Sequence, residues 1–442
     1  MDDHSGSREG ALAPPFTLYE LIHELRSGER PLLEFLEELE IRFAEWEPRV
    51  QAFVPEEEGF QRLQRDARLL LDRYPEPVTR PPLFGVPVGV KDIFHVAGIP
   101  THAGSRLPAE MFQGPEAAVV TALKKAGALV LGKTVTTEFA YFAPGPTRNP
   151  HHLDHTPGGS SSGSAAAVAA GLCPLALGTQ TIGSIVRPAA FCGVVGFKPS
   201  YDRISREGVI PLSPSLDHVG FFTPEVTGAH RAAALICAEW QPAQGESAPA
   251  LGVPHGPYLE RASEEGLAHF HDVCDRLAQA GVVVKPVPAM PDFSEIVARH
   301  NCLMSAEAAS VHEVWFARFD HLYHAKTAAL LTKGEMAPAA AVQAAREGRA
   351  RLRQELMNLM DEHQIDLWIA PSAPGPAPSG LESTGDPIMN LPWTQSGLPA
   401  VNVPAGTNEA GLPLGVQLVG RWYEDEALLQ WTERIESAIR EG

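Results

Sequence analysis

The hydrophobic pattern begins with two amphipathic segments near the N-terminus. Thr17 and Glu20 form a capping box for a helix that Gly28 ends. A second helix follows, and its apolar side chains recur at helical spacing: Leu32, Leu36, Leu39 and Phe43. Residues 16–75 are therefore predicted to form a helical arm. The polar residues 1–15 before it are predicted to be a disordered leader.

The pattern changes after about residue 80, where short apolar runs alternate with helical segments. Residues 86–90 and 128–131 are apolar and bounded by Gly or Pro, as buried strands are. A helical segment separates them, and a further helix over 165–170 precedes a strand over 174–177. This alternation predicts an α/β layered fold.

The second half of the chain is predicted to be mainly helical over 260–364, interrupted by a strand at 282–284. We interpret this stretch as a helical, lid-like insertion. Beyond it, the segments LPAVNVPAG and LPLGVQLVG are typical of paired strands, and the second is expected to close the central sheet. The pattern as a whole predicts one large domain.

Composition places the chain among ordinary globular proteins. Of its 442 residues 44% are hydrophobic and 20% charged, and the net charge of −19 argues against nucleic-acid binding. The five cysteines are scattered and lack metal-ligand spacing, which favours a reducing compartment. We find neither an N-terminal signal region nor an apolar run of the roughly 18 residues that a membrane span needs. We therefore expect a soluble, cytoplasmic protein that binds neither membrane nor nucleic acid.

Two clusters of small hydroxyl residues lie between residues 156 and 200. GGSSSGS (158–164) precedes an Ala-rich helix, and GTQTIGS (178–184) follows the next strand. By composition alone, a Gly-Ser string is as often a flexible linker as a structured loop. This one leads directly into a packed helix, so its backbone NH groups are expected to face a binding partner. The small residues before Ser184 let the backbone turn sharply, expose the hydroxyl and aim successive NH groups into an oxyanion hole.

Lys91 is the third candidate for chemistry. The chain has eight lysines against 27 arginines, and Lys91 ends the apolar run VPVGV. A lysine at the end of a buried strand loses hydration of its ammonium, which lowers the pKa towards a range where the amine can act as a base. Taken alone, Lys91 is better explained as a strand-end lysine that forms a structural ion pair with Asp92; the nearby serine motifs favour a catalytic role instead.

Together these residues resemble the amidase signature family of hydrolases. The segments LFGVPVGVKDIF, AGIPTHAGS, GALVLGKTVTTEFA, RPAAFCGVVGFKPS and STGDPIMNLPWTQSGLPAVNVPAG are similar to family segments, over about residues 17–430. The resemblance implies a single large α/β/α layered domain with a central mixed sheet flanked by helices. Residues 76–230 would be the amidase signature core and 231–442 the remainder of the same domain.

The resemblance also implies a Ser-cisSer-Lys triad. Ser184 would be the nucleophile, and Ser160, 24 positions earlier and after a cis peptide bond, would relay its proton to Lys91. The oxyanion hole would be formed by the backbone NH groups of four residues: Thr181, Ile182, Gly183 and Ser184. No metal or organic cofactor is implied.

The chain departs from the family at three positions. Gln180 and Ile182 stand where family members commonly carry Asp and Gly, and Arg187 lies three residues after Ser184 instead of two. The Gln and the shifted Arg resemble a recognised branch of shorter members, whereas the Ile182 side chain is expected to narrow or re-aim the pocket. The substrate pocket is expected to be lined by four residues: Tyr141, Phe142, Gly159 and Ser161.

Three other motifs have weaker support. GALVLGKT (127–134) fits the phosphate-loop pattern, but its four variable residues form the predicted strand and not an NH-rich loop. HHLDH (151–155) lies in a Pro-bounded turn with no further metal ligand at a telling spacing. Asp217 and His218 are adjacent, so neither can readily orient the other as in a Ser-His-Asp triad.

The resulting hypothesis is a serine-dependent C–N hydrolase, such as an aryl acylamidase or a urethanase. It would cleave an amide, aryl amide or carbamate bond of a small molecule through an acyl-enzyme on Ser184. One alternative is an amidotransferase subunit that releases ammonia from glutamine in a complex; Gln180 and the short C-terminal half argue against it. Another is a non-catalytic scaffold of the same fold, against which the joint presence of Lys91, Ser160 and Ser184 argues. We expect a monomer or a homodimer.

Overall fold

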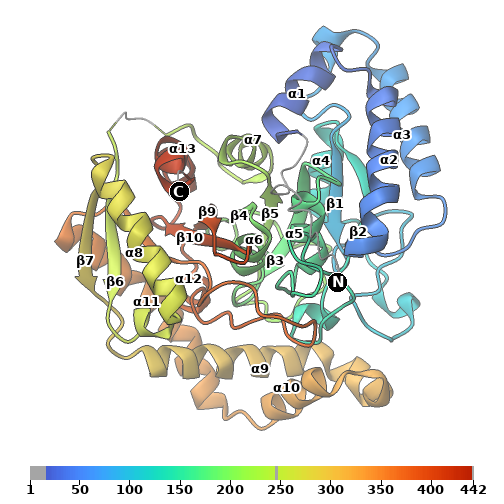
Figure 1. Cartoon of the computed structure of the whole chain (residues 1–442). Helices are drawn as coiled ribbons and strands as arrows, with labels where there is room; N and C mark the ends of the chain where they lie inside the picture. The colour runs from blue at the N-terminus through green and yellow to red at the C-terminus, as the bar shows by residue number, and fades with distance from the viewer. Residues whose placement is uncertain (1–15, 244–246, 441–442) are drawn as a thin grey trace, which may run out of the picture.

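The computed structural model describes residues 16–243 and 247–440, so the expected leader, 1–15, lies outside the described residues. Ten strands in the described residues form one central sheet (Figure 1). Five come from the N-terminal part of the chain: β1 (Pro87–Lys91), β2 (Leu129–Thr134), β3 (Leu175–Gln180), β4 (Val195–Lys198) and β5 (His218–Thr223). Five follow in the C-terminal part: β6 (Ala250–His255), β7 (Val283–Pro288), β8 (Leu367–Pro371), β9 (Ala400–Thr407) and β10 (Pro413–Val419).

The strand order is β2-β1-β3-β5-β4-β9-β10-β8-β6-β7. β1 is parallel to β2 and β3, and β6 is parallel to β7 and β8, whereas the strands from β3 to β8 pair antiparallel. The sheet is therefore mixed, and the predicted α/β fold class is confirmed. The expectation that the last strand closes the sheet is wrong, because β10 pairs with β9 on one side and with β8 on the other.

Three helices precede the sheet: α1 (Leu18–Ser27), α2 (Leu32–Val50) and α3 (Gly59–Arg73). The Thr17 hydroxyl accepts a hydrogen bond from the backbone NH of Glu20 at 3.1 Å, which is the N-cap half of the predicted capping box. The Glu20 carboxylate accepts from the Thr17 hydroxyl at 2.9 Å, whereas a full capping box would have it accept from the Thr17 backbone NH. Helix α1 ends at Gly28, whose φ of 83° lies in the left-handed region. Arg62 of α3 donates to the carbonyl of Leu131 and so attaches these helices to β2.

Further helices flank the sheet: α4 (Ala118–Lys125), α5 (Ser162–Ala169), α6 (Val186–Cys192), α7 (Val226–Ile236), α12 (Leu391–Ser396) and α13 (Asp425–Arg440). Every residue of α5 and α6 is buried. Because α5 consists of Ser, Gly, Ala and Val, its small side chains let it pack closely on β1 and β3. Short 3₁₀ helices lie in the connections: Pro77–Thr79, Ala109–Phe112, Glu138–Ala140, Leu259–Arg261 and Asp320–Leu322.

Residues 260–364 are mainly helical with one strand, as predicted. Their helices are α8 (Glu264–Gln279), α9 (Phe293–Phe319), α10 (Ala325–Glu335) and α11 (Ala339–His363). Helices α9 and α10 pack side by side below the sheet in the view of Figure 1. The strand β7 of this region pairs with β6. Sequence patterns did not predict β6, because Gly252 and Pro254 interrupt the hydrophobic pattern of that strand.

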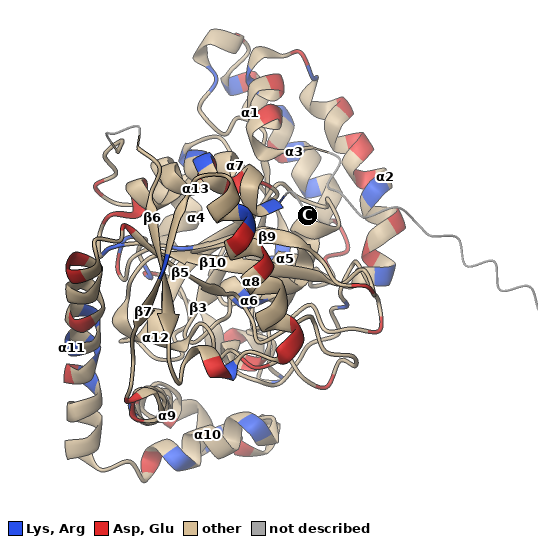
Figure 2. Cartoon of the chain, turned by 60° about the vertical axis from the view of Figure 1, so that its left-hand side comes forward, with Lys and Arg blue, Asp and Glu red and all other residues tan. Residues whose placement is uncertain are grey.

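Charged side chains are carried mainly by the outer helices (Figure 2). Helices α2, α10 and α11 carry charged residues of both signs, whereas the central strands are mostly uncharged (Figure 2). In residues 16–243 and 247–440, no helix is long and apolar enough to cross a membrane. Lys91, at the end of β1, is an ionisable residue inside this largely uncharged interior.

Candidate active site

The carboxyl ends of β1 and β3 lie side by side at one edge of the sheet. The two strands are parallel and adjacent, with Val90 opposite Leu177. Lys91 is the last residue of β1, and the turn 181–184 follows β3 directly. Ligands of open α/β sheets bind outside the carboxyl ends of the strands. The topology therefore brings two of the sequence-predicted segments to the place where a site is expected.

Lys91 is completely buried, and its amine bridges two hydroxyl groups. Lys91 Nζ donates a hydrogen bond to Ser160 Oγ at 2.8 Å and another to Thr179 Oγ1 at 2.7 Å. Burial lowers the pKa of Lys91 well below its usual value, because the ammonium loses its hydration. The negative charge of Asp217 counteracts part of this shift. The amine is thus positioned to accept a proton from Ser160.

The Gly-Ser string is tightly packed and is not a linker. Its Gly159–Ser160 peptide bond is cis, as the resemblance implied, and the Ser160 side chain is buried. A Cβ on Gly163 would lie 2.1 Å from the carbonyl oxygen of Ala52, so that position accepts only glycine. The Gly159 carbonyl accepts a hydrogen bond from Arg187 at 2.5 Å. These contacts fix the position of the Ser160 hydroxyl.

Ser184 lies in the turn between β3 and α6. Its side chain is 8% exposed, and its hydroxyl makes no hydrogen bond to any residue in the described ranges, Ser160 included. A Cβ on Gly183 would lie 2.3 Å from Asn390 Oδ1, so the residue before Ser184 cannot carry a side chain without displacing Asn390. The Ser184 hydroxyl is thus unpaired within the described residues, on a turn whose backbone has close neighbours.

Gln180 and Thr394 anchor this turn. Gln180 Oε1 accepts hydrogen bonds from the backbone NH groups of Ile185 at 2.8 Å and Val186 at 3.0 Å, at the start of α6. Gln180 Nε2 donates to Thr394 Oγ1 at 2.9 Å, and Thr394 Oγ1 donates to the carbonyl of Ile182 at 2.6 Å. An Asp at position 180 would have no NH₂ group to donate. The departure from the family residue therefore creates a link to Thr394 that only an amide provides.

Thr181 is held by Asp217. Thr181 Oγ1 donates to Asp217 Oδ1 at 2.6 Å, and Asp217 Oδ2 accepts from the backbone NH groups of Leu212 and Ser213 at 2.9 and 3.0 Å. Burial raises the pKa of Asp217 to about 6, although these hydrogen bonds act in the opposite direction. The turn expected to form the oxyanion hole is thus held by hydrogen bonds at two residues, at Thr181 by Asp217 and at Ile182 by Thr394.

A small hollow adjoins Ser184, with a volume of about 10 Å³. Tyr141 and Phe142, two of the expected pocket residues, are part of its wall. Ile182 from the turn and Met304 from α9 also line it. The space at the Ser184 hydroxyl is therefore narrow.

Gly159 and Ser161, the other two expected pocket residues, are not among the residues that line this hollow. The Ser161 hydroxyl donates to the carbonyl of Thr179 at 3.2 Å. Gly159 lies against the side chain of Thr384. In the structure both residues hold the Gly-Ser segment against its neighbours.

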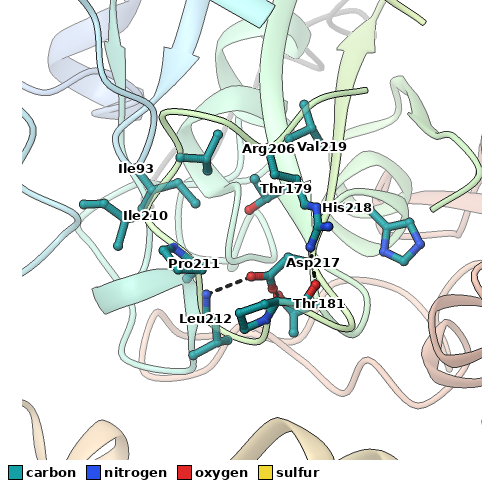
Figure 3. A pocket seen from close by; sticks show the side chains of 13 residues that line it. Ile93, Thr179, Thr181, Arg206, Ile210, Pro211, Leu212, Asp217, His218 and Val219 are labelled. Atoms are coloured by element: carbon teal, nitrogen blue, oxygen red, sulfur yellow. Dashed lines mark hydrogen bonds between the residues drawn. The ribbon is translucent and has the colours of Figure 1, made fainter. Parts of the chain in front are cut away.

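A larger cavity of about 290 Å³ lies next to the hollow (Figure 3). Ala140, Thr181 and Leu212 line both spaces. Thr179, whose hydroxyl binds the Lys91 amine, is part of the cavity wall. The site thus combines a narrow space at the turn with a wider space on the side of the lysine.

The phosphate-loop pattern and the histidine cluster have structural explanations. Residues 129–134 of the pattern form β2, and Lys133 pairs with Asp92 at 2.7 Å, so Asp92 is not the partner of Lys91. In the cluster, His151 Nε2 lies 2.9 Å from the carbonyl oxygen of Cys192. Among the described residues, no group of three or more His, Cys, Asp or Glu side chains could hold a metal ion.

Asp217 and His218 do not act on one another. His218 Nδ1 lies 2.6 Å from the carbonyl oxygen of Leu216, and its ring is set apart from the Asp217 carboxylate (Figure 3). The Asp217 carboxylate binds Thr181 instead. The arrangement is not that of a Ser-His-Asp triad.

Sequence analysis assigned no role to Thr179, Met304, Asn390 or Thr394. Thr179 could have been found from strand order, because a residue near the carboxyl end of β3 must lie beside the end of β1. Asn390 and Thr394 lie in the segment STGDPIMNLPWTQSG, and no spacing along the chain connects it to the turn at Ser184. Met304 enters from α9, whose position against the sheet could not be read from its helical pattern.

Comparison with known proteins agrees with this geometry. Residues 34–429 match the family model of the amidases. A glutamyl-tRNA(Gln) amidotransferase subunit of Synechococcus sp. (strain WH7803) is 32% identical to this chain, over 94% of the chain and 95% of that protein. The same subunit of Synechococcus sp. (strain RCC307) is 33% identical, with the same coverage of both chains.

Solved structures show the same similarity. A crystal structure of an amidase superposes with a TM-score of 0.88 at 32% identity, covering 96% of this chain and 100% of that one. The peptide amidase from Stenotrophomonas maltophilia superposes with a TM-score of 0.80 at 26% identity, covering 96% of this chain and 97% of that one. In both cases the similarity covers nearly the whole chain.

Proposed function

The chain belongs to the amidase signature family of amide-cleaving enzymes, and from this premise we propose that it is a serine-dependent hydrolase with Ser184 as its nucleophile. The hydrogen bond of 2.8 Å between Lys91 Nζ and Ser160 Oγ carries the proposal. A nucleophilic serine needs a neighbouring base, and a buried amine with a lowered pKa that binds a second serine can serve as that base. No metal or organic cofactor takes part in the proposed reaction.

The first half of the reaction forms an acyl-enzyme. Ser184 Oγ attacks the carbonyl carbon of the substrate, its proton passes to Ser160, and the proton of Ser160 passes to neutral Lys91. The hydrogen bond between Ser184 and Ser160 that this transfer needs forms when the substrate is bound, since catalytic hydrogen bonds often tighten only in the complex. The C–N bond then breaks, and the proton returns through Ser160 to the leaving nitrogen.

The turn 181–184 supplies the oxyanion hole. Its backbone NH groups face the carbonyl oxygen as that oxygen gains negative charge. The hydrogen bonds of Thr181 to Asp217 and of Ile182 to Thr394 support this role, because NH groups fixed in advance need no reorganisation during the reaction. Water then hydrolyses the ester on Ser184 and releases the acid.

The substrate is a small amide, aryl amide or carbamate. Tyr141, Phe142 and Ile182 line the hollow at Ser184, and their side chains favour uncharged groups. The charged residue of this wall, Arg187, already donates hydrogen bonds to the carbonyls of Gly385 and Gly159. A zwitterion such as glutamine would lose hydration of both charges against this wall. The hydrophobic side chains of this wall therefore support a hydrolase of hydrophobic substrates.

An amidotransferase subunit is the second candidate. The relatives from Synechococcus carry that name and are 32% and 33% identical over nearly the whole chain. Such a protein would release ammonia from glutamine and would depend on partner subunits. The two candidates share the triad, so the triad cannot distinguish them. They differ in their substrate and in whether the chain is active without partner subunits.

A hydrolysis panel on the purified chain separates them. We expect an anilide or an aryl carbamate to be turned over with a higher kcat/KM than glutamine, without nucleotide and in the presence of EDTA. Glutamine as the best substrate would favour the amidotransferase subunit. Loss of activity with EDTA would exclude the serine mechanism, and no turnover of any substrate would favour a non-catalytic scaffold.

We propose a cytoplasmic location and a monomeric or homodimeric state. The five free thiols support a reducing compartment, since thiols persist there. Cell fractionation tests the location, and light scattering on the purified chain gives the mass of the assembly.

A further inference from the structure

We propose that the 290 Å³ cavity binds an uncharged, apolar group on the amine side of the scissile bond, such as the aryl ring of an anilide. The proposal rests on the hydrolase function proposed above and specifies its substrate class. It assigns the acyl side of the substrate to the narrow hollow at Ser184.

The wall of the cavity is mainly apolar. Its apolar lining residues are Ile93, Ala140, Val209, Ile210, Pro211, Leu212, Pro214 and Val219. In Figure 3, Ile93 and Ile210 lie on one side and Val219 on the other. Burying an apolar group against such a wall stabilises the complex, whereas a charged group would lose its hydration.

The two charged residues of the wall already have protein partners. Arg206 Nη2 donates to Asp202 at 2.6 Å, and Arg206 Nη1 donates to the carbonyl of Pro214. The Asp217 carboxylate accepts three hydrogen bonds, from Thr181 and from the backbone of Leu212 and Ser213. Neither group needs an opposite charge on a ligand, so the cavity selects for a neutral occupant.

The volume suits one ring or a short branched chain. A dry cavity of about 150 Å³ lined by aliphatic and aromatic side chains is enough to bind benzene. The cavity here is about twice that size, and it lies near the lower limit of about 300 Å³ for ordinary ligand pockets. A phenyl ring fits with room for one substituent.

The position of the cavity points to the amine side. Lys91 Nζ binds both Ser160 and Thr179, and Thr179 is part of the cavity wall. The leaving nitrogen must face Ser160 to receive its proton. A substituent on that nitrogen therefore lies on the lysine side of the site, where the cavity is, and the acyl group lies on the other side.

Two pairs of substrates test this assignment. Acetamide and acetanilide share the acetyl group and differ on the amine side, whereas acetamide and benzamide release the same ammonia and differ on the acyl side. The readout is the ratio of kcat/KM within each pair, which cancels any general loss of activity in a variant.

Val209 is the position to change, because it lines the cavity but not the hollow at Ser184. We expect Val209→Trp to lower the acetanilide-to-acetamide ratio by about tenfold or more, because the indole fills the cavity. Val209→Ala should instead raise the ratio for a para-substituted anilide against acetanilide. Val314→Trp is the matched control, since Val314 is 67% exposed on α9, and it should leave both ratios at the wild-type values.

The outcomes separate the two proposals. Suppose that wild type hydrolyses these amides. If Val209→Trp then changes the kcat/KM ratio of the benzamide pair instead of the anilide pair, or changes neither ratio, the assignment of the cavity is wrong while the hydrolase function stands. If Val209→Trp does not fold, Val209→Ala decides, and an unchanged preference among anilides overturns the assignment. If wild type hydrolyses none of the three, the hydrolase function itself has failed.

Discussion

The Lys91 amine lies 2.8 Å from the Ser160 hydroxyl, although 69 positions separate the two residues along the chain. Lys91 reaches this place as the last residue of β1, and Ser160 reaches it from the packed segment before α5. Both side chains are buried, so a proton on one has few destinations other than its partner. The pair is suited to pass a proton in either direction, which formation and breakdown of an acyl-enzyme both require.

Activity should rise with pH as Lys91 loses its proton. Below its pKa the residue is an ammonium and cannot accept a proton; above it the neutral amine can. Because burial lowers the pKa of Lys91, the rise should be complete well below the ordinary lysine value of about 10.4. A profile of kcat/KM against pH measures this, and a rise centred on the ordinary lysine value would contradict the assignment.

Replacement of Lys91 should show that the base must be an amine. We expect Lys91→Arg to be as inactive as Lys91→Ala, because a guanidinium stays protonated and cannot act as a base. Lys285→Ala is a control, since Lys285 lies on the edge strand β7 and contacts only backbone carbonyls in the described chain. Substantial hydrolysis by the arginine variant would point to another base.

Removal of the Ser184 hydroxyl should abolish hydrolysis while the protein stays folded. The change deletes the attacking oxygen but little volume, and loss of a covalent nucleophile costs on the order of 10⁴-fold or more in kcat. A fluorophosphonate should label wild type at Ser184 and should not label Ser184→Ala. Ser379→Ala, in an exposed loop, should behave as wild type. A variant that keeps more than about one hundredth of the activity would sink the nucleophile assignment.

The parts of the molecule that could be predicted from the sequence are those whose signals lie within a few residues. The N-cap at Thr17 involves only four positions, and its hydroxyl accepts the backbone NH of Glu20 as predicted. The run of buried residues that ends at Lys91 predicted a strand with a buried amine, and the structure has both. Local patterns sufficed there because the physical cause is itself local.

What could not be predicted depends on which segments meet. The strand β10 lies inside the sheet, between β9 and β8. Its hydrophobic pattern would be the same if it were a buried strand at the edge of the sheet, so the pattern alone could not locate it. Thr394 and Met304 reach the site from segments far from Ser184 along the chain. The size of the space at Ser184 follows from these contacts, so the resemblance to a family could not predict the dimensions of the pocket.

Thr394 should act as a positioning residue for the oxyanion hole. Thr394→Val removes the hydroxyl and leaves Gln180 Nε2 and the carbonyl of Ile182 without their partner. We expect the free energy of unfolding to fall by about 1–3 kcal/mol, because buried polar groups lose hydrogen bonds. We also expect kcat to fall about 10- to 100-fold with a smaller change in KM, because the turn loses its alignment.

The conservative variant distinguishes positioning from bulk packing. Thr394→Ser keeps the hydroxyl and loses only a methyl group, so it should recover most of kcat even where it loses some stability. If Ser and Val at this position gave the same kcat, the hydroxyl would have no part in aligning the turn. Denaturant unfolding and steady-state kinetics on the same preparations give both quantities.

Ile182 should limit the acyl group that the site accepts. Its side chain is 6% exposed and lines the hollow of about 10 Å³ at Ser184, where the family commonly has Gly. Ile182→Ala opens this hollow, so kcat/KM for benzamide should rise relative to acetamide by about tenfold. The same change should lower the free energy of unfolding by about 2–5 kcal/mol, because a buried side chain is lost.

Ile41→Ala is the control, at a position 71% exposed on α2. It should change the free energy of unfolding by less than about 0.5 kcal/mol and leave the ratio of the two amides as in wild type. If Ile182→Ala lost stability but kept the wild-type ratio of the two amides, the acyl group would be bounded by another residue of the hollow, with Met304 the next to test.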